Sequence, residues 1–502
     1  MAWGAAGTAD GQLAYPGGIA VAGERVYVAD TGNNRIQIFR PMTYTLPIAT
    51  INTVSSRSLV QGQDALTLRA SASDSDESHD PTKLSYRWYR DNTLLGSTAT
   101  LTVPATALPV GTYAISLEVT DEEGQVSQRV STALDVSPPP RAPWTFMLYL
   151  VADSALDGNN LLDMLDTGFG NGLLARLRKQ APNAQVQVVV ELDGPSYGDT
   201  RRMVLEPNGQ MRELWRGELP MDDPDTLSNF VRWARQDYPA EHYYLVIAGH
   251  GNGYQGTAWD DTSGPNAYLS AAELRRALEN ASGDGASPID VLHLDSCSMG
   301  LLDVAYELRD QVTYLVASQN LDWGFFLQDR YRAQTGAATT PRQLGEAIVT
   351  TYAEYLEQQS RASFSQEQYP YTIALLDLRR ATPTVAALDG LARDLGAFAV
   401  ASSSNRGILA EIRTASQKLD SQEPFVLSNL DEYVDLVDWA TRLRDSPVIS
   451  DPAIHTRAAD VIRALTGDNP LIVRQRNSAA QFGVAGRLIN LSGANGISIY
   501  YP

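Results

Sequence analysis

Apolar and polar residues alternate in short stretches through the first quarter of the chain. Residues 17–39, GGIAVAGERVYVADTGNNRIQIF, show this alternation between Gly and Asn turns, and so do LSYRWYRDN and GTYAISLEVTDEEG farther along. A period of two places successive side chains on opposite faces of a strand, so the pattern predicts small antiparallel sheets over 1–42 and 51–137. The proline run in SPPPRAP cannot continue a strand ladder and predicts a linker at 138–143.

The pattern changes after residue 143. Unbroken apolar runs such as VQVVVELD, YYLVIAGH and IDVLHLD now alternate with helical patterns such as LSNFVRWARQ and SAAELRRALEN. Strands that are apolar throughout are buried on both faces, and intervening helices connect one parallel strand to the next. Residues 143–502 are therefore predicted to form one large α/β domain with a mostly parallel central sheet between helical layers.

Composition and charge narrow the classes of partner. The 502 residues include 59 acidic and 39 basic side chains, a formal net charge of -20. This charge repels phosphate backbones, and no basic stripe with interleaved aromatics is present, so we expect no nucleic-acid partner and favour a cationic substrate. No apolar run approaches the roughly 18 residues of a membrane-spanning helix, and the first ten residues lack the features of a signal peptide. These features predict no particular oligomeric state.

The single cysteine, Cys297, follows the predicted strand in IDVLHLDSCSMG, and His250 ends another predicted strand before a glycine-rich loop. Ligands of open α/β sheets bind beyond the carboxyl ends of the strands. The apolar spacing in MGLLDVAYELRD predicts a helix directly after Cys297, whose N-terminus would favour a thiolate. His250 would protonate a leaving amine, and the amides of Gly251 and Cys297 would stabilise an oxyanion. The alternative is a buried structural cysteine and a hydrogen-bonded histidine.

Other candidate motifs predict no cofactor site. GNGYQG fits G-x-G-x-x-G, but a loop-forming segment rather than a helix follows it, so no dinucleotide site is expected. No H-E-x-x-H motif or Cys/His cluster is present, so we expect no catalytic metal. The acidic loop SASDSDESHD matches no EF-hand spacing, and calcium stays an open possibility rather than a requirement. His293, inside a predicted strand, is expected to be a packed or hydrogen-bonded residue.

Residues 143–502 resemble the clostripain family of cysteine peptidases. The resemblance rests on segments in the same order and at similar intervals, among them WTFMLYLVADSALDGNNL, HYYLVIAGHGNG, IDVLHLDSCSMGLLDVAYELRD, LVASQNLDWGFF and NGISIYYP. It implies a caspase-like three-layer α/β sandwich and a catalytic dyad of His250 and Cys297 that needs no third residue. Ser298 and His293 depart from the usual apolar residues of the family at these positions.

The same resemblance implies a substrate site beside the dyad. Residues two apart on a strand share a side, so Asp295 can lie with Cys297 and belong to an S1 site for Arg, or less well Lys. An Asp that caps the following helix is the alternative. The resemblance also implies that Ser318, Gln319 and Trp323 line the substrate cleft.

The first 137 residues resemble two modules. Residues 1–42 resemble one NHL repeat, a single blade of a β-propeller, which suggests a remnant or a chain cut from a longer one. Residues 51–137 resemble a PKD-type or immunoglobulin-like sandwich, on Tyr86, Trp88 and the turn VTDEEG.

Together these features predict a bacterial cysteine endopeptidase, extracellular or at the cell surface, that cleaves proteins or peptides after Arg or Lys. The alternative is a non-catalytic adhesion protein with a degenerate peptidase domain. Arg275 and Arg276 are the only Arg or Lys residues between His250 and Cys297. They lie in a helical pattern that resists proteases, so self-cleavage there is the less favoured alternative.

Overall fold

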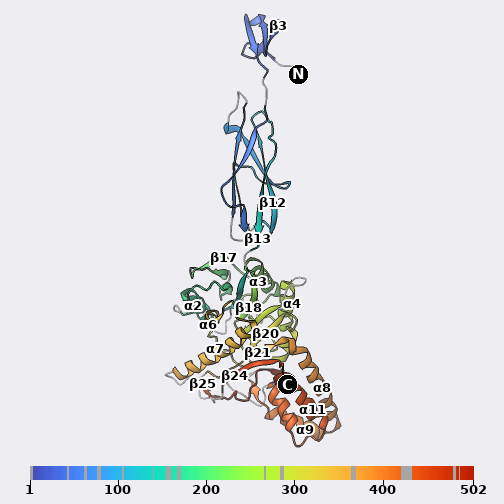
Figure 1. The fold of residues 1–502 in the computed structure, drawn as a ribbon. Coiled ribbons are helices and arrows are strands. Elements are labelled where there is room, and N and C mark those ends of the chain that lie inside the picture. The colour runs from blue at the N-terminus through green and yellow to red at the C-terminus, as the bar shows by residue number, and fades with distance from the viewer. Residues whose placement is uncertain are drawn as a thin grey trace. The chain divides into compact units, whose positions relative to one another are not determined.

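The chain divides into two units, Met1–Pro139 and Pro140–Pro502, which we describe separately (Figure 1). The division falls within the predicted linker, although a strand already begins at Ala142. The computed structural model describes residues 4–41, 45–61, 65–75, 81–104, 107–138, 141–153, 160–166, 171–264, 267–282, 288–362, 369–419, 432–478, 482–484 and 487–501. The second half of the acidic loop SASDSDESHD, 76–80, lies outside these residues.

The first unit contains a β-sandwich. One sheet has the order β10 (Thr93–Gly96), β9 (Ser85–Arg90), β12 (Gly111–Thr120), β13 (Val130–Ser137) and β7 (Ser58–Val60), and the other the order β11 (Thr100–Pro104), β8 (Ala65–Ser73) and β6 (Ile48–Thr53). Inward-facing residues of both sheets form one core around Trp88, which is fully buried. The indole Nε1 donates to the carbonyl of Thr98 at 2.9 Å, so the polar atom of this large side chain is paired inside the core.

A small antiparallel sheet precedes the sandwich in the chain. Its strands are β3 (Pro16–Ala22), β4 (Arg25–Asp30) and β5 (Arg35–Phe39). Two short strands that come before it in the chain, β1 (Ala5–Ala6) and β2 (Gln12–Leu13), pair with each other. Asp30 is buried and accepts hydrogen bonds from Asn33, Arg35 and Gln37. Ile19, Val21, Ile36 and Ile38 are exposed. The register places these residues on opposite faces, so apolar side chains are exposed on both sides of the sheet.

The second unit is built on a nine-stranded sheet. Its order is β17 (Met211–Gly217), β16 (Thr200–Leu205), β15 (Val186–Asp193), β14 (Ala142–Val151), β18 (Ala240–Ala248), β19 (Ile289–Asp295), β20 (Val312–Ala317), β21 (Thr372–Asp377) and β24 (Ile472–Asn477). The five strands from β15 to β20 are parallel, whereas the two outer strands on each side pair antiparallel. The sheet is therefore mixed rather than mostly parallel, because short turns join β15, β16 and β17 without crossover helices.

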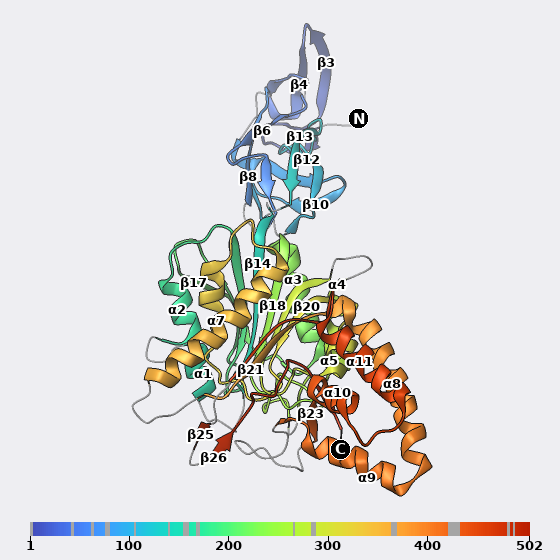
Figure 2. The ribbon, with the colours of Figure 1, turned by 60° about the horizontal axis from the view of Figure 1, so that its bottom comes forward.

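Helices cover both faces of this sheet (Figure 2). One face carries α1 (Asn160–Leu165), α2 (Leu173–Lys179), α6 (Gln328–Gln334) and α7 (Pro341–Ala362). The other carries α3 (Pro224–Asp237), α4 (Ala271–Ser282), α5 (Leu302–Glu307), α8 (Ala381–Ala401), α9 (Ser403–Ala415), α10 (Leu436–Asp445) and α11 (Pro452–Thr466). Arg275 and Arg276 lie within α4, as the sequence predicted. The central strands are buried on both sides, which explains their unbroken apolar sequences.

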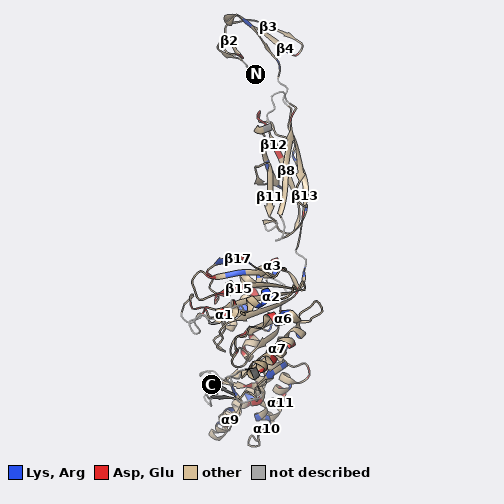
Figure 3. Ribbon diagram, turned by 90° about the vertical axis from the view of Figure 1, so that its left-hand side faces the viewer, with Lys and Arg blue, Asp and Glu red and all other residues tan. Residues whose placement is uncertain are grey.

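Two small sheets complete the unit: β22 (Lys418–Leu419) with β23 (Tyr433–Asp435) and β27 (Ser498–Tyr500), and β25 (Phe482–Val484) with β26 (Arg487–Ile489). Charges of opposite sign lie side by side on the long helices, as Arg342 and Glu346 do on α7 and Asp460 and Arg463 on α11 (Figure 3). None of the described helices is both long enough and apolar enough to cross a lipid bilayer.

Candidate active site

His250 and Cys297 leave the sheet at the same edge. Their strands, β18 and β19, are parallel neighbours in a register that places Ala248 opposite Asp295. Each side chain follows the end of its strand by two residues. Both residues are partly exposed, whereas the strands that precede them are buried. A thiol and an imidazole therefore occupy equivalent positions after adjacent strands, at the edge where open α/β sheets bind their ligands.

The loops that carry the two side chains are in direct contact. A Cβ atom added to Gly251 would lie 2.6 Å from the carbonyl oxygen of Cys297, so only glycine fits there. Thr257 Oγ1 lies 3.2 Å from the carbonyl oxygen of His250 and 2.9 Å from Ser296 Oγ, and so connects the two loops. These contacts hold the loop after β18 against the residue that precedes the cysteine.

The prediction that a helix starts directly after Cys297 was wrong. Helix α5 begins at Leu302, and Ser298 lies in a turn with φ 61°. The turn forms because the amide of Ser298 donates to the carbonyl of Asn320 at 2.8 Å, which pairs this segment with the loop after β20. The local donor to the sulfur is instead the backbone amide of Asp322, 3.3 Å from Cys297 Sγ. A backbone N–H directed at sulfur favours the thiolate, as a helix N-terminus would.

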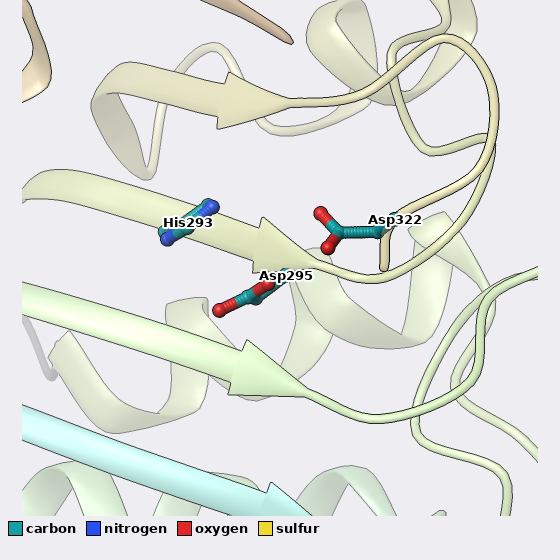
Figure 4. Close-up of side chains that lie close together, drawn as sticks. All are labelled: His293, Asp295 and Asp322. Atoms are coloured by element: carbon teal, nitrogen blue, oxygen red, sulfur yellow. The ribbon is translucent and has the colours of Figure 1, made fainter. Parts of the chain in front are cut away.

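Asp295 lies beside a second carboxylate (Figure 4). Asp295 ends β19 and is 2% exposed, and Asp322 lies in the loop after β20 with its side chain directed toward the end of β19. Atoms of His293, Asp295 and Asp322 lie within 4.8 Å of one another. Asp295 does not cap the following helix, because the N-cap of α5 is Leu301 and no side chain caps it. Sequence reasoning missed Asp322, although it too follows a parallel strand at this edge.

Burial controls the charge of this cluster. It raises the pKa of Asp295 to about 6. It also raises the pKa of Asp322 to about 8, with a further contribution from the neighbouring charge of Asp295. His293 has a pKa lowered to about 4 by burial and is neutral near pH 7, where its Nδ1 lies 3.0 Å from Tyr244 Oη. The two carboxyl groups therefore carry less than two negative charges near neutral pH in the absence of a cation.

Several acceptors in the cluster are unused. Asp295 Oδ2 accepts from Gln328 Nε2 at 2.5 Å, and Asp322 Oδ1 accepts from Tyr352 Oη at 2.9 Å. Asp295 Oδ1, Asp322 Oδ2 and Gln328 Oε1 are buried and have no hydrogen-bond partner among the described residues. Buried acceptors are costly to leave unpaired, so this cluster is suited to a ligand that brings several donors.

The other predicted substrate contacts, Ser318, Gln319 and Trp323, differ in how far they are exposed. Ser318 and Gln319 are each 1% exposed. Ser318 Oγ bonds within the loop and to Thr372 Oγ1 at 3.0 Å, and Gln319 Nε2 donates to Asp435 Oδ2 at 3.0 Å and to Ser498 Oγ at 2.9 Å. These two side chains connect the loop after β20 to residues of β21, β23 and β27. Trp323 is partly exposed, and its Nε1 donates to the carbonyl of Pro370 at 2.6 Å, which orients the ring beside Asp322.

The model of the clostripain family, Peptidase_C11, matches residues 173–501, well over half of the chain. The chain belongs to the clostripain family. Within the first unit, the NHL repeat model matches residues 13–39.

Known members of the clostripain family are related over different shares of their length. Clostripain from Hathewaya histolytica is 26% identical over 308 residues, which are 50% of this chain and 56% of that protein. This chain thus spans about half the length of that curated relative. A secreted C11 cysteine protease from Bacteroides thetaiotaomicron, solved with an irreversible peptide inhibitor, covers 72% of this chain and 93% of its own at 16% identity and a TM-score of 0.51. An inactive zymogen C11 protease from Parabacteroides distasonis gives 17% identity, the same coverages and a TM-score of 0.50. These likenesses establish the fold of the second unit as that of C11 proteases.

Proposed function

We propose that residues 140–502 form a cysteine endopeptidase that cleaves peptide bonds after basic residues, with Arg preferred over Lys, through Cys297 and His250. The observation that carries the proposal is the register of β18 and β19, which brings both side chains to one edge beside two buried carboxyl groups. Membership of the clostripain family supports the same reading.

Apart from substrate and water, the proposed reaction uses only protein groups. The Cys297 thiolate attacks the scissile carbonyl carbon, so a C–S bond forms while the carbonyl electrons move to oxygen. The amides of Gly251 and Cys297 would stabilise this oxyanion. The C–N bond then breaks as His250 protonates the departing amine, and water hydrolyses the thioester and restores the thiol. The close approach of Gly251 to the cysteine supports this arrangement.

Asp295 and Asp322 are proposed to bind the side chain that precedes the scissile bond. A guanidinium carries five N–H donors in a plane, and the three unused acceptors are of the type it needs. A bound cation would also favour ionisation of both carboxyl groups. Lys offers a point charge with three donors and pairs with fewer of these acceptors than the five donors of Arg, which supports the preference for Arg. Trp323, which is partly exposed and follows Asp322, is a further proposed contact with the substrate.

The architecture of the two units and the location of the protein are proposed as well. We propose that the second unit has the caspase-like three-layer arrangement, supported by helices on both faces of the sheet. The sandwich is proposed to be a PKD-type module, supported by its two sheets around Trp88. Because the Bacteroides thetaiotaomicron relative is described as secreted, we propose an extracellular or cell-surface protein that acts on peptide substrates.

Fluorogenic peptides that differ only in the residue before the reporter provide the test. Cys297→Ala and His250→Ala should each lower kcat/KM for the Arg peptide by at least about a thousandfold. His242→Ala is the matched control. His242 lies on the same strand, where its Nδ1 is 3.1 Å from Asp290, and its loss should leave turnover nearly unchanged.

Turnover that survives Cys297→Ala would contradict the cysteine mechanism. If the unaltered protein cleaves none of the basic peptides, the adhesion alternative gains instead. Cleavage after Ala or Glu as fast as after Arg would leave a peptidase but remove the proposed role of Asp295.

A further inference from the structure

Three tyrosines gather at the same edge of the sheet as His250 and Cys297. Tyr254 lies in the glycine-rich loop that follows His250, Tyr433 begins β23, and Tyr500 ends β27. The ring centroid of Tyr500 lies 5.3 Å from that of Tyr254 and 5.9 Å from that of Tyr433. We call these residues the tyrosine cluster. The proposed cleavage reaction assigns them no role.

The loop after His250 holds Tyr254 in a defined position. Gly251 and Thr257 pair as an antiparallel bridge, so Tyr254 lies in the tip of a short hairpin. The amide of Tyr254 donates to Tyr433 Oη at 3.0 Å. Gly253 has φ 56°, and a Cβ atom added to it would clash with Tyr433 Oη, so only glycine fits at this contact.

The strands that carry the other two tyrosines are joined to the loops of the active site. Strand β27 lies against the segment after Cys297, where the amide of Ser498 donates to the carbonyl of Gly300 at 2.9 Å. Gln319, in the loop after β20, donates to Asp435 of β23 and to Ser498 of β27. Because β23 and β27 also pair with each other, the tyrosine cluster is fixed relative to the cysteine.

Two of the three rings are open to solvent. Tyr254 is 62% exposed and Tyr500 is 41% exposed, whereas Tyr433 is buried. Among the described ring pairs, this is the one in which both residues are exposed. The hydroxyl of Tyr500 bonds to the Glu432 carboxylate, which raises the pKa of Tyr500 and orients its ring. Two adjoining, oriented rings offer an apolar surface that a further aromatic ring can pack against.

The tyrosine cluster and the two buried carboxyl groups lie toward opposite faces of the sheet. Asp295 and Asp322 bond to side chains of α6 and α7, which cover one face. Tyr433 packs in the core of the other face, where β23 leads into α10 (Figure 2). The loops of His250 and Cys297 leave the sheet between these two helical layers.

This arrangement gives the bound peptide a direction, and the argument for it rests on the proposed function. There Asp295 binds the side chain before the scissile bond, and His250 protonates the departing amine. That amine is the first atom of the leaving part of the peptide, so the leaving part begins beside His250. Tyr254 follows His250 by four residues in the hairpin. A peptide with its basic residue beside Asp295 therefore passes its next residues over the tyrosine cluster.

We propose that Tyr254 and Tyr500 bind an aromatic or large aliphatic side chain at one of the first two positions after the scissile bond. Tyr433 is a positioning residue, because its hydroxyl holds the hairpin that carries Tyr254. The substrate side chain would pack on the two exposed rings and remove apolar surface from water. The enzyme would then select a basic residue before the bond and an apolar residue after it.

The test measures binding rather than turnover. It uses the full chain carrying Cys297→Ala, so that the peptides stay intact. Fluorescein-labelled peptides share one sequence with a single Arg, and differ in having Ala at both following positions or Phe at one of them. Fluorescence anisotropy gives the Kd of each. We expect one of the Phe peptides to bind about tenfold more tightly than the Ala peptide.

Variants of the exposed rings locate this preference. Tyr254→Ala and Tyr500→Ala should each reduce the preference for Phe to about twofold or less, because either change removes one of the two rings. Tyr254→Phe should keep the preference, since the ring and not the hydroxyl makes the contact. Tyr197→Ala is the matched control. Tyr197 is 84% exposed and lies in the loop after β15, so its loss should leave the preference unchanged.

Equal Kd values for the Phe and Ala peptides would overturn the proposal, and so would a preference that both Ala variants retain. A preference for Phe only before the Arg would mean that the peptide runs in the opposite direction, and would also overturn it. These results leave cleavage after basic residues standing. If replacing Arg by Glu leaves Kd unchanged while the preference for Phe persists, the role of Asp295 fails and the tyrosine site remains.

Discussion

Two carboxylate clusters lie at one edge of one sheet but differ in the groups around them. One contains His293, Asp295 and Asp322, and the other contains Asp153, Asp193 and Asp260. Both are buried, both have raised pKa values, and both bring their oxygens within 4.8 Å. Beside Asp295, three acceptors from three side chains are unused and a thiol lies next to them. Beside Asp193, by contrast, Asp260 accepts from Met221 N, Thr262 Oγ1 and Ser263 N. Asp193 Oδ2 is the one buried oxygen of these three carboxylates without a hydrogen-bond partner among the described residues.

This difference separates the clusters by what the protein itself supplies. Beside Asp295, buried acceptors remain for the donors of a ligand, whereas beside Asp193 the hydroxyls and amides of the protein already pair most of the oxygens. Residue type and burial alone would not separate the two clusters.

The largest effect is expected from Asp295→Asn. Removing one charge from a buried pair with a guanidinium costs about 2–5 kcal/mol, so kcat/KM for an Arg peptide should fall by about a thousandfold. The rate at which a small neutral reagent alkylates Cys297 should change little in this variant, since such a reagent brings no guanidinium to Asp295. Asp193→Asn should lower kcat/KM less than tenfold, because Asp193 belongs to the other cluster. Equal losses in both variants would erase the distinction between the clusters.

A pH-dependent change in stability is expected from Asp322→Asn. The pKa of Asp322 is raised from 3.8 to about 8 in the folded protein. Between these values the folded state holds a proton that the unfolded chain has released, so the contribution of this group to stability falls as pH rises from about 4 to about 8. Asn mimics the protonated form.

In EDTA, Asp322→Asn should therefore unfold at the same denaturant concentration as the parent near pH 4. At pH 8.5 it should be more stable by at least about 1 kcal/mol. Exposed Asp468→Asn should show no such divergence. A constant difference across this range would mean that burial does not control the charge of Asp322.

A smaller effect is expected from Gln328→Met. The substitution keeps the length of the side chain but removes the donor to Asp295 Oδ2. Loss of a hydrogen bond to a charged group costs about 1.5–3 kcal/mol, part of which the bound guanidinium recovers by bonding to the freed oxygen. We expect KM for Arg peptides to rise about tenfold with kcat little changed. A fall in kcat at constant KM would assign Gln328 to the reaction itself.

The smallest effect is expected from Thr257→Val. This substitution removes the hydroxyl that connects the loop of His250 to Ser296, the residue before Cys297. One hydrogen bond contributes about 1 kcal/mol, so activity should fall by about fivefold. Unchanged activity would show that another contact holds the loops of His250 and Cys297 together.

Local patterns in the sequence predicted the elements more reliably than their arrangement. The alternation in 51–137 and the unbroken apolar runs after 143 predicted strands that the structure contains. The same apolar runs predicted a mostly parallel sheet, and the antiparallel edges were missed, because a buried strand has the same composition in either direction. The helix after Cys297 was placed four residues too early, because pairing with the loop after β20 outweighs helical propensity there.

For the site, the amino-acid pattern alone predicted that a thiol, an imidazole and a carboxylate follow or end strands, since the apolar runs end at His250 and at Asp295, two residues before Cys297. Which side chains join them depends on the fold. Asp322 and Gln328 complete one cluster, and Asp153, Asp193 and Asp260 form another, because strand order and register bring distant residues to one edge. A periodic pattern records which face of a strand is buried; it does not record which strand lies beside it, and that neighbour sets burial, charge and ligand chemistry.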